Sequence, residues 1–283
     1  MSDVFSTAQR GSEPGPRPVR PPVPCNFWAV VPCAGTGVRA SAGAGGTAEA
    51  PKQYRLVAGR PLVLHTLAAF AGVERLRSTL VAVAPGDEFF DSHPGSGYFA
   101  VPCGGASRAE TVRGSLRALV ERGAQERDWV LVHDAARCLV SAEQINALID
   151  ACVGDQVGGL LAHKLADTLK TASAGPGGIR VVSTVDRGDK WLAQTPQMFR
   201  LGQLTKALEQ FGSTATDEAS AIEATGEHPR LVPGSALNFK VTFPEDFALA
   251  EAVLVQRMHA GTLARFGGAP GHACPPAAQQ ENR

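Results

Sequence analysis

Val30-Val31-Pro32-Cys33-Ala34-Gly35-Thr36-Gly37-Val38-Arg39 is the most informative stretch of this sequence, and Pro51-Lys52-Gln53-Tyr54 follows it. An apolar run, residues 27–31, ends in a loop of small residues and then meets two isolated cations, Arg39 and Lys52. Glycine lets backbone N–H groups approach an anion closely, and successive N–H groups in such a turn form an anion-binding concavity. The order therefore predicts a buried strand that ends in a phosphate-binding loop. A Gly-x-Gly by itself is also compatible with a turn that needs glycine only for its geometry.

Composition excludes several classes of protein. The 283 residues contain 27 lysines and arginines against 27 aspartates and glutamates, so no overall basic field favours nucleic acid. The longest apolar runs are far below the roughly 18 residues of a membrane span, and the N-terminus has no apolar signal core. The cysteines are scattered without a C-x-x-C pair, which argues against a zinc site or a disulfide framework. We expect a cytoplasmic protein that binds neither nucleic acid nor membranes.

Alternating apolar runs and helical patterns predict one α/β domain over residues 25–260. Residues 1–24 and 261–283 are expected to be disordered tails, because they are rich in proline or polar residues. Unbroken apolar runs at 80–84 and 129–132 are typical of strands covered on both faces, as in parallel sheets. The expected fold is a doubly wound, mostly parallel sheet. Helices are predicted at 61–70, 108–122, 201–211 and 244–258, a further helix capped by Ser141, and a last short strand at 237–242.

A protruding β-hairpin arm is predicted at about residues 163–188. The runs 160–170 and 179–187 flank Ser173-Ala174-Gly175-Pro176-Gly177-Gly178, which is rich in turn residues. Because an isolated hairpin is marginally stable in water, we expect this arm to pack on a partner subunit, giving a homodimer.

The expected loops carry cations and one well-placed acid. Asp134 follows the strand at 129–132, and ligands of open α/β sheets bind beyond the carboxyl ends of strands. A carboxylate there can hold Mg²⁺ carried by nucleotide phosphates, while an ion pair with Arg137 that shapes the turn is an alternative that does not exclude the first. Arg108 stands in the first turn of its helix, where it opposes the macrodipole, so it is better placed to hold a ligand. No nucleophile–base pair is evident, which favours phosphate chemistry by charge stabilisation.

Two other classes of nucleotide-binding protein have sequence motifs that can be compared with this chain. The sequence has no G-x-x-x-x-G-K-[ST], which disfavours a P-loop NTPase. Residues 35–40 do fit the permitted dinucleotide pattern G-x-G-x-x-A, so a dehydrogenase stays open on this motif alone. Against it, no acidic residue closes a second strand about 20 residues further on.

The motifs together resemble the 2-C-methyl-D-erythritol 4-phosphate cytidylyltransferase family, from about Phe27 to Met258. They occur in the family's order: Pro32-Cys33-Ala34-Gly35-Thr36-Gly37-Val38-Arg39, Pro51-Lys52-Gln53-Tyr54, Gly104-Gly105-Ala106-Ser107-Arg108, Val132-His133-Asp134-Ala135-Ala136-Arg137, Val185-Asp186-Arg187, Thr195-Pro196-Gln197, Thr216-Asp217-Glu218-Ala219 and Lys240-Val241-Thr242.

The resemblance implies that CTP and methylerythritol phosphate give a CDP-linked product and pyrophosphate, in the non-mevalonate route to isoprenoids, with Mg²⁺ or another divalent cation. The catalytic residues it implies are Arg39, Lys52, Arg187 and Lys240. The nucleotide-binding residues are Cys33, Ala34, Gly35, Gly37, Gly104, Gly105, Arg108, Thr111, Asp134 and Ala135, with Asp134 near the metal. The acceptor-binding residues are Thr168, Arg187, Thr195, Thr216 and Lys240, of which Thr168 and Arg187 lie on the arm and belong to the other subunit's site.

Some positions depart from the family pattern. The segment between Arg39 and Lys52 is longer than usual, and Ala106 and Leu237 replace commonly acidic residues. A related cytidylyltransferase that acts on ribitol 5-phosphate is therefore the nearest alternative. A binding or regulatory module that keeps only the nucleotide pocket is an alternative of a different class, which the retained cations disfavour.

Overall fold

The computed structural model describes residues 25–35 and 51–266. The predicted tail at 1–24 and the predicted site residues Gly37 and Arg39 lie outside the described residues, and so does the predicted tail at 261–283 from residue 267 onward. Residues 261–266 of that predicted tail are helical instead. Within those limits the central element is a seven-stranded sheet in the order β11-β7-β10-β6-β1-β4-β5. Its strands are β1 (Phe27–Pro32), β4 (Leu76–Ala82), β5 (Tyr98–Val101), β6 (Trp129–Val132), β7 (Gly158–Lys164), β10 (Trp191–Arg200) and β11 (Arg230–Pro233).

The sheet is mostly parallel, as predicted. β1 pairs in parallel with β4 and β6, β4 with β5, and β7 with β11. Only β10 runs antiparallel, between β6 and β7, among the described strands of this sheet. The unbroken apolar runs of β1 and β6 are explained by burial on both faces, since alternate side chains of a strand point to opposite sides.

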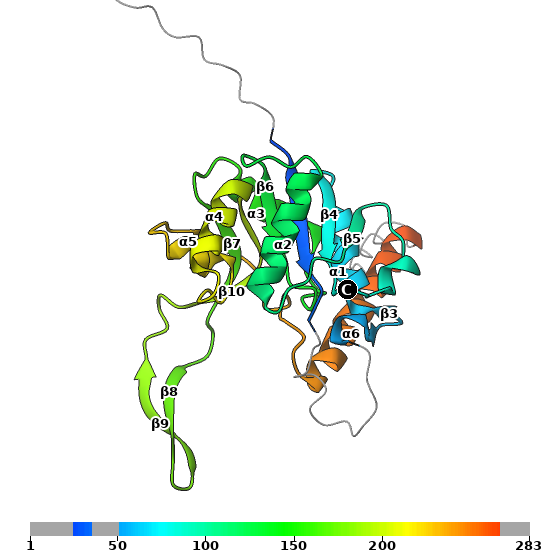
Figure 1. Cartoon of the computed structure of the whole chain (residues 1–283). Coiled ribbons are helices and arrows are strands. Elements are labelled where there is room, and N and C mark those ends of the chain that lie inside the picture. Colours follow the sequence, from blue (N-terminus) through cyan, green and yellow to red (C-terminus); the bar gives the residue numbers. More distant parts are fainter. Residues whose placement is uncertain (1–24, 36–50, 267–283) are drawn as a thin grey trace, which may run out of the picture.

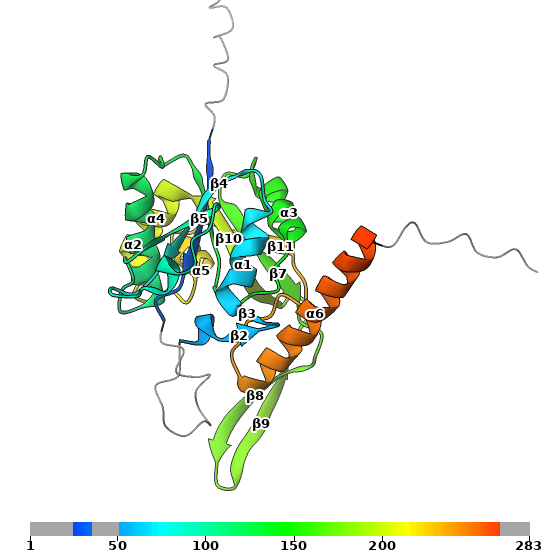
Figure 2. The same cartoon turned by 90° about the vertical axis from the view of Figure 1, so that its right-hand side faces the viewer.

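Helices form a layer on each side of the sheet (Figures 1 and 2). α2 (Arg108–Glu121), α4 (Leu201–Phe211) and α5 (Glu218–Glu223) pack on the face that carries Val30 and Val130. α1 (Leu62–Ala71) and α3 (Ala142–Cys152) cover the face that carries Ala29 and Leu131. The predicted serine caps are confirmed, because Ser107 and Ser141 each accept a backbone N–H at the start of α2 and α3.

The strand order reverses between β1 and β6. From β1 the chain runs outward through β4 and β5, and it then returns to the other side of β1 to form β6. Ligands of open α/β folds bind where the strand order reverses, beyond the carboxyl ends of the strands. Cys33-Ala34-Gly35 and His133-Asp134-Ala135 follow those two ends, so the topology brings the predicted site residues together.

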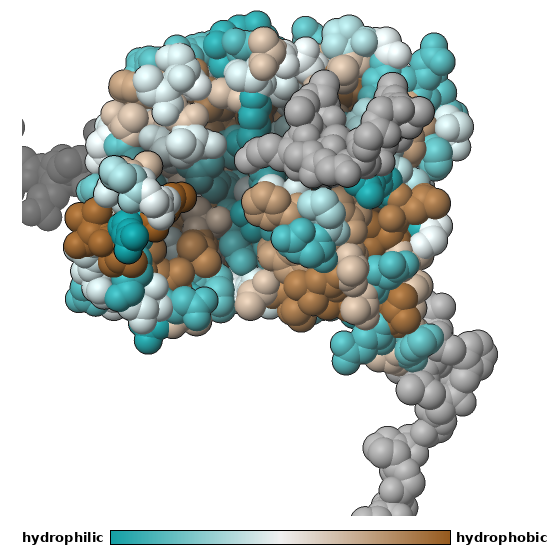
Figure 3. Space-filling view, turned by 90° about the horizontal axis from the view of Figure 1, so that it is seen from below, coloured by the Kyte–Doolittle hydropathy of each residue, from teal (hydrophilic) through white to brown (hydrophobic). Residues whose placement is uncertain are grey.

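The arm consists of β8 (Leu169–Gly175) and β9 (Gly178–Val185), which pair only with each other among the described strands. It projects from the main body (Figure 1). Apolar side chains on it face solvent within this chain: Ile179 is 80% exposed, and Val181 and Val182 are each 65% exposed. Seen from below, the left side of the molecule, where the arm projects, shows apolar side chains at its surface (Figure 3). The run 160–170, expected as one arm strand, is divided, because residues 158–164 pair with β10 and β11 in the central sheet instead.

Two predictions near the C-terminus were wrong. Residues 237–242 form no strand, and the strand at the edge beside β7 is β11. The 237–242 segment is held instead by side-chain bonds and by the bond from Val241 N–H to the carbonyl of Ala136. The last helix, α6 (Pro244–Phe266), extends past the predicted end at Met258 (Figure 2). None of the helices in the described part of the chain has the length and apolar composition of a membrane span.

Four short elements connect β1, α1 and β5. They are the 3₁₀ turns η2 (Lys52–Tyr54) and η3 (Phe89–Asp91) and the two-stranded ribbon β2 (Leu56–Val57) and β3 (Arg60–Pro61). η2 carries the predicted catalytic lysine.

Candidate nucleotidyl-transfer site

A cavity of about 510 Å³ lies at the switch point between β1 and β6. Most of the residues predicted to bind nucleotide line it. Its walls are Pro32, Cys33, Ala34, Gly35, Lys52, Gln53, Gly105, Ala106, Ser107, Arg108, Thr111, Asp134, Ala135, Ala136 and Lys240.

A second cavity, of about 240 Å³, adjoins the first. The two share Arg108, Asp134 and Lys240. Thr195 and Thr216, both predicted to bind the acceptor, line the second cavity together with Arg137, Ala193, Gln194, Gln197 and Asp217. Three charged residues therefore stand where ligands in the two cavities would meet.

Asp134 is the centre of that shared wall. Its Oδ1 accepts a hydrogen bond from Arg108 Nε at 2.9 Å, and its Oδ2 accepts one from Lys240 Nζ at 2.9 Å. Arg137 Nε lies 3.8 Å from Oδ2, which confirms the predicted ion pair within the turn. Burial by itself raises the pKa of Asp134, but the neighbouring cations outweigh it and hold that pKa well below its usual range. The carboxylate is thus ionised at neutral pH and holds the two cations from distant segments.

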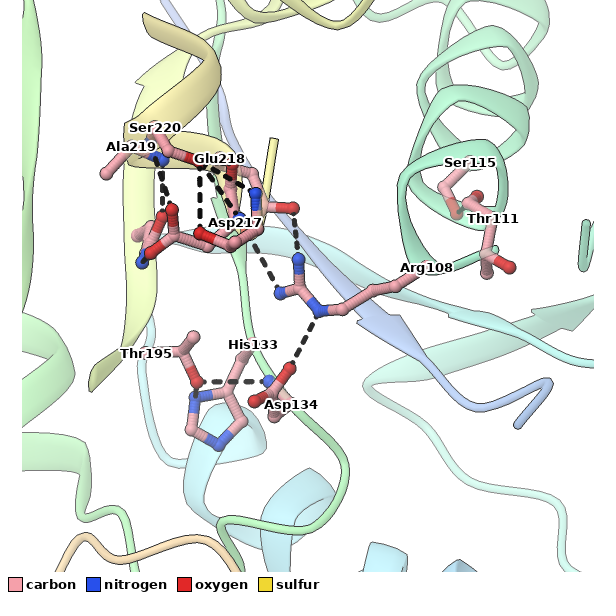
Figure 4. A network of polar contacts seen from close by, with 12 residues as sticks. Arg108, Thr111, Ser115, His133, Asp134, Thr195, Asp217, Glu218, Ala219 and Ser220 are labelled. Atoms are coloured by element: carbon pink, nitrogen blue, oxygen red, sulfur yellow. Dashed lines mark hydrogen bonds and ion pairs between the residues drawn. The ribbon is translucent and has the colours of Figure 1, made fainter. Parts of the chain in front are cut away.

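Arg108 joins two carboxylates (Figure 4). Besides Asp134, it binds Glu218 with both terminal nitrogens, Nη1 to Oε1 at 2.6 Å and Nη2 to Oε2 at 3.0 Å. Glu218 is fully buried, although it stands in the first turn of α5. Sequence reasoning missed this partner, because a glutamate at a helix start is ordinarily solvated and favours the dipole. The Arg108 side chain is therefore fixed before any ligand binds.

His133 and Thr195 connect β6 with β10 behind Asp134 (Figure 4). The His133 Nε2 lies 3.2 Å from the carbonyl of Arg137, which can only accept, so Nε2 carries the proton. Nδ1 then accepts from the Thr195 hydroxyl at 3.0 Å, and that hydroxyl oxygen accepts the Asp134 N–H at 3.0 Å. Burial lowers the pKa of His133 to about 4, so the ring is neutral at pH 7. In this chain the Thr195 hydroxyl orients Asp134, and its contact with an acceptor stays a prediction.

The predicted glycines differ in their roles. Gly105 lines the first cavity, and its N–H donates to Thr111 Oγ1 at 3.0 Å. Gly104 stands behind it: a Cβ there would lie 2.3 Å from the Cβ of Ala34 and 2.8 Å from the carbonyl oxygen of Val83. Only glycine permits this approach, so Gly104 supports the cavity wall by close packing.

Thr168 and Arg187 are not brought to either cavity within one chain. Both are exposed, and they lie at the base of the arm, before β8 and after β9. Neither residue lines the cavities around Asp134.

The described residues contain no group of three or more His, Cys, Asp or Glu that could hold a metal ion by themselves. Among the described residues that line the first cavity, Asp134 is the one carboxylate. Mg²⁺ is commonly held by one or two carboxylates together with substrate phosphates, so this donor set fits a cation that arrives with a nucleotide.

The fold and the cation-lined cavity at its switch point define a nucleotide-binding α/β protein of the nucleotidyltransferase class. Residues 27–256 match the family model of IspD, 2-C-methyl-D-erythritol 4-phosphate cytidylyltransferase. The chain belongs to this family, whose activity is CTP-dependent cytidylyl transfer in isoprenoid biosynthesis, and it is accordingly a cytidylyltransferase.

Relatives support the assignment along nearly the whole domain. The chain is 49% identical over 239 residues to a 2-C-methyl-D-erythritol 4-phosphate cytidylyltransferase of Burkholderia multivorans, covering 83% of this chain and 98% of the relative. It is 60% identical over 232 residues to a bifunctional enzyme IspD/IspF of Albidiferax ferrireducens. That match covers 81% of this chain and 53% of the relative, so the chain spans about half the length of the bifunctional protein.

Solved structures show the same architecture. A crystal structure of 4-diphosphocytidyl-2C-methyl-D-erythritol synthase superposes with a TM-score of 0.69 and 36% identity, covering 82% of this chain and 100% of that one. The Francisella tularensis 2-C-methyl-D-erythritol 4-phosphate cytidylyltransferase gives a TM-score of 0.66 and 32% identity, covering 80% of this chain and 99% of that one.

Proposed function

We propose that this chain joins CMP from CTP to 2-C-methyl-D-erythritol 4-phosphate, with the larger cavity binding CTP and the smaller one binding the acceptor. The observation that carries this assignment is the shared wall of Arg108, Asp134 and Lys240 between the two cavities. Two polyanions that must react have to be held together against their mutual repulsion, and cations between them do so.

The chemistry requires no general base. A phosphate monoester is already an anion at neutral pH, so its oxygen can attack the α-phosphorus of CTP while pyrophosphate leaves. His133, which precedes Asp134 of the shared wall, has both ring nitrogens hydrogen-bonded inside the protein. Asp134 is occupied by cations. Positioning and charge stabilisation are therefore the tasks of the protein.

Individual roles follow from the positions. Lys52, and Arg39 by family resemblance, serve the CTP phosphates and the charge that develops during transfer. Lys240 orients the acceptor phosphate from the shared wall, with Thr195 and Thr216 nearby. Thr168 and Arg187 act in the site of the other subunit, since within one chain they lie outside both cavities.

Mg²⁺ is proposed to arrive with CTP and to lie near Asp134. When bound, it neutralises charge on the phosphate oxygens. The protein's own contribution is to keep Asp134 ionised and the surrounding cations in place.

A homodimer in the cytoplasm is the proposed form of the enzyme. The exposed apolar side chains of the arm would be buried against a second copy, which would stabilise a hairpin that is marginal alone. Cys25, Cys33, Cys103, Cys138 and Cys152 are unpaired thiols, as expected in a reducing compartment.

Pyrophosphate release tests the proposed acceptor and nucleotide. Purified protein is assayed with CTP, UTP or ATP against methylerythritol phosphate or ribitol 5-phosphate, with and without Mg²⁺. We expect release only with CTP, methylerythritol phosphate and Mg²⁺ together. If CTP released pyrophosphate with ribitol 5-phosphate but not with methylerythritol phosphate, the acceptor assignment would be overturned and the nucleotide site would still hold. If the protein bound CTP but released no pyrophosphate with any acceptor, the proposed catalysis would be overturned.

A further inference from the structure

Gln53 is a buried side chain that ties the end of β1 to the turn carrying Lys52. It is only 6% exposed. Its Nε2 donates one hydrogen bond to the carbonyl of Cys33 at 2.8 Å and a second to the carbonyl of Gly35 at 2.9 Å. Both amide protons of one side chain are thus used on the first residues after β1, and Gln53 also borders the larger cavity.

These two bonds determine how the backbone faces the cavity. The carbonyl and N–H of a trans peptide unit point in opposite directions. A Cys33 carbonyl turned toward Gln53 therefore turns the N–H of Ala34 away from it. Among the described residues that N–H has no hydrogen-bond acceptor, although Ala34 lines the cavity. The N–H is left for an anion, in the manner of a backbone anion site.

The turn that carries Gln53 is itself anchored on both sides. The Tyr54 hydroxyl donates to Asp87 Oδ2 at 2.6 Å, and its ring stacks on that of Phe89 with centroids 3.9 Å apart. On the other side, Lys52 Nζ donates to the carbonyl of Val241 at 2.6 Å. The turn is thus held in place independently of Gln53, so the two Gln53 bonds fix the backbone after β1 relative to an already anchored Lys52 backbone.

We propose that Gln53 is a positioning residue, which fixes the backbone after β1 and the Lys52 backbone relative to each other so that both address the same polyphosphate. This inference rests on the CTP site proposed above. It gives Gln53 a role in which the side chain contacts the protein backbone and no reacting atom. It predicts that loss of the Gln53 amide weakens CTP binding without altering the acceptor site.

The test is a pair of substitutions with a matched control. Gln53→Met keeps the length of the side chain and removes both donors, and Gln53→Glu keeps its shape but places a carboxylate against two carbonyls. Gln144→Met is the control, because Gln144 also bonds backbone, at the start of α3, and does not line either cavity. Each protein is characterised by its Kd for CTP with Mg²⁺ from calorimetry, KM for both substrates, kcat and melting temperature.

We expect Gln53→Met to raise the Kd for CTP about tenfold or more. Without the two Gln53 bonds the Ala34 N–H would no longer be held toward a phosphate, and the loss would be that of a hydrogen bond to a charged group. Gln53→Glu should raise the Kd for CTP further. In both variants the KM for methylerythritol phosphate should stay within about twofold, because the Gln53 amide bonds only the backbone after β1. Gln144→Met should lower the melting temperature alone. Unchanged CTP affinity in Gln53→Met or Gln53→Glu would overturn the positioning role. Failure of the unsubstituted protein to bind CTP would instead overturn the nucleotide site itself.

Discussion

Asp134 shows how one residue organises two ligand sites. It binds Arg108 from the start of α2 and Lys240 from the segment before α6, and its own backbone is held by Thr195. In the absence of phosphates these cations neutralise a buried carboxylate whose desolvation would otherwise be costly. The same bonds hold Arg108 and Lys240 in the wall that the two cavities share, so binding of the proposed polyanionic substrates would need little reorganisation of these side chains.

Substitution of cations proposed for two different tasks should give different kinetic signatures. Lys52→Ala, and likewise Arg39→Ala, should lower kcat by roughly 10²-fold or more with a smaller rise in KM, because the lost charge acts mainly on the transition state. Arg187→Ala should raise KM for methylerythritol phosphate about tenfold and leave CTP binding nearly unchanged. Steady-state kinetics with each substrate varied will show this, with Lys170→Ala as an arm control. If Lys52→Ala and Arg39→Ala instead raised the KM for methylerythritol phosphate, and Arg187→Ala lowered kcat, the two sites would be exchanged.

At the scale of elements, the junction of β6 and β10 combines stability with site geometry. His133 is completely buried, and its two bonds join the Asp-Ala-Ala-Arg turn after β6 to Thr195 on β10. Asn238 adds a third connection, from its Nδ2 to the carbonyl of Thr195 at 2.8 Å. Elements from distant parts of the chain are thereby held around Asp134.

This junction should make folding stability depend on pH. The pKa of His133 lies near 4 in the folded chain and about 6.5 unfolded, so below pH 6.5 the unfolded state binds a proton that the folded state does not. The stabilisation from a neutral His133 is complete above that pH and is lost as pH falls toward 4. We expect a loss of about 1 kcal/mol between pH 7.5 and 5.5 in urea unfolding.

His133→Gln should remove most of that slope, whereas His228→Gln, at an exposed position, should retain it. A slope in His133→Gln equal to that of the unsubstituted protein would show that another group is responsible.

Prediction at the scale of elements succeeded where a local pattern was sufficient. Ser107 and Ser141 are recognisable caps, and the helical repeat of 201–211 needs no knowledge of the rest of the fold. The segment 237–242 alternates like a strand but forms none, because a strand requires a neighbouring edge. The available edge, that of β7, is occupied by β11.

For the whole molecule, the arm is the element on which the proposed dimer depends. Its apolar side chains are exposed in one chain, and Arg187 at its base lies outside both cavities. A twofold dimer would supply each arm to the other subunit and bury those side chains.

Mixed dimers test this arrangement directly. If Arg187 acts in the partner's site, co-expression of Lys52→Ala chains with Arg187→Ala chains produces heterodimers in which one site keeps both residues. Random pairing makes about half of the dimers mixed, so about a quarter of all sites are restored before separation and about half of the sites in mixed dimers isolated by tandem tags. Pyrophosphate release from the isolated mixed dimers, identified by mass, measures this recovery.

The control pairs Lys52→Ala with a chain that carries both substitutions, which leaves no site intact. No recovery in the mixed dimers would place Arg187 in its own chain's site.

The sequence alone determined the doubly wound sheet, the two-sided burial of its strands, the hairpin arm, and the identity of most cavity-lining residues. The sheet, the burial of its strands and the arm follow from the pattern of neighbouring residues, which is complete in the chain itself. Most of the cavity-lining residues were implied by the resemblance of the ordered motifs to a known family. Only the tertiary structure decided that Glu218 holds Arg108, that Thr195 bonds His133, and that Gln53 bonds the backbone after β1. Such partners lie up to 110 residues apart. Each pairing is selected by burial, because a polar group removed from water must find a partner in three dimensions, wherever that partner stands in the sequence.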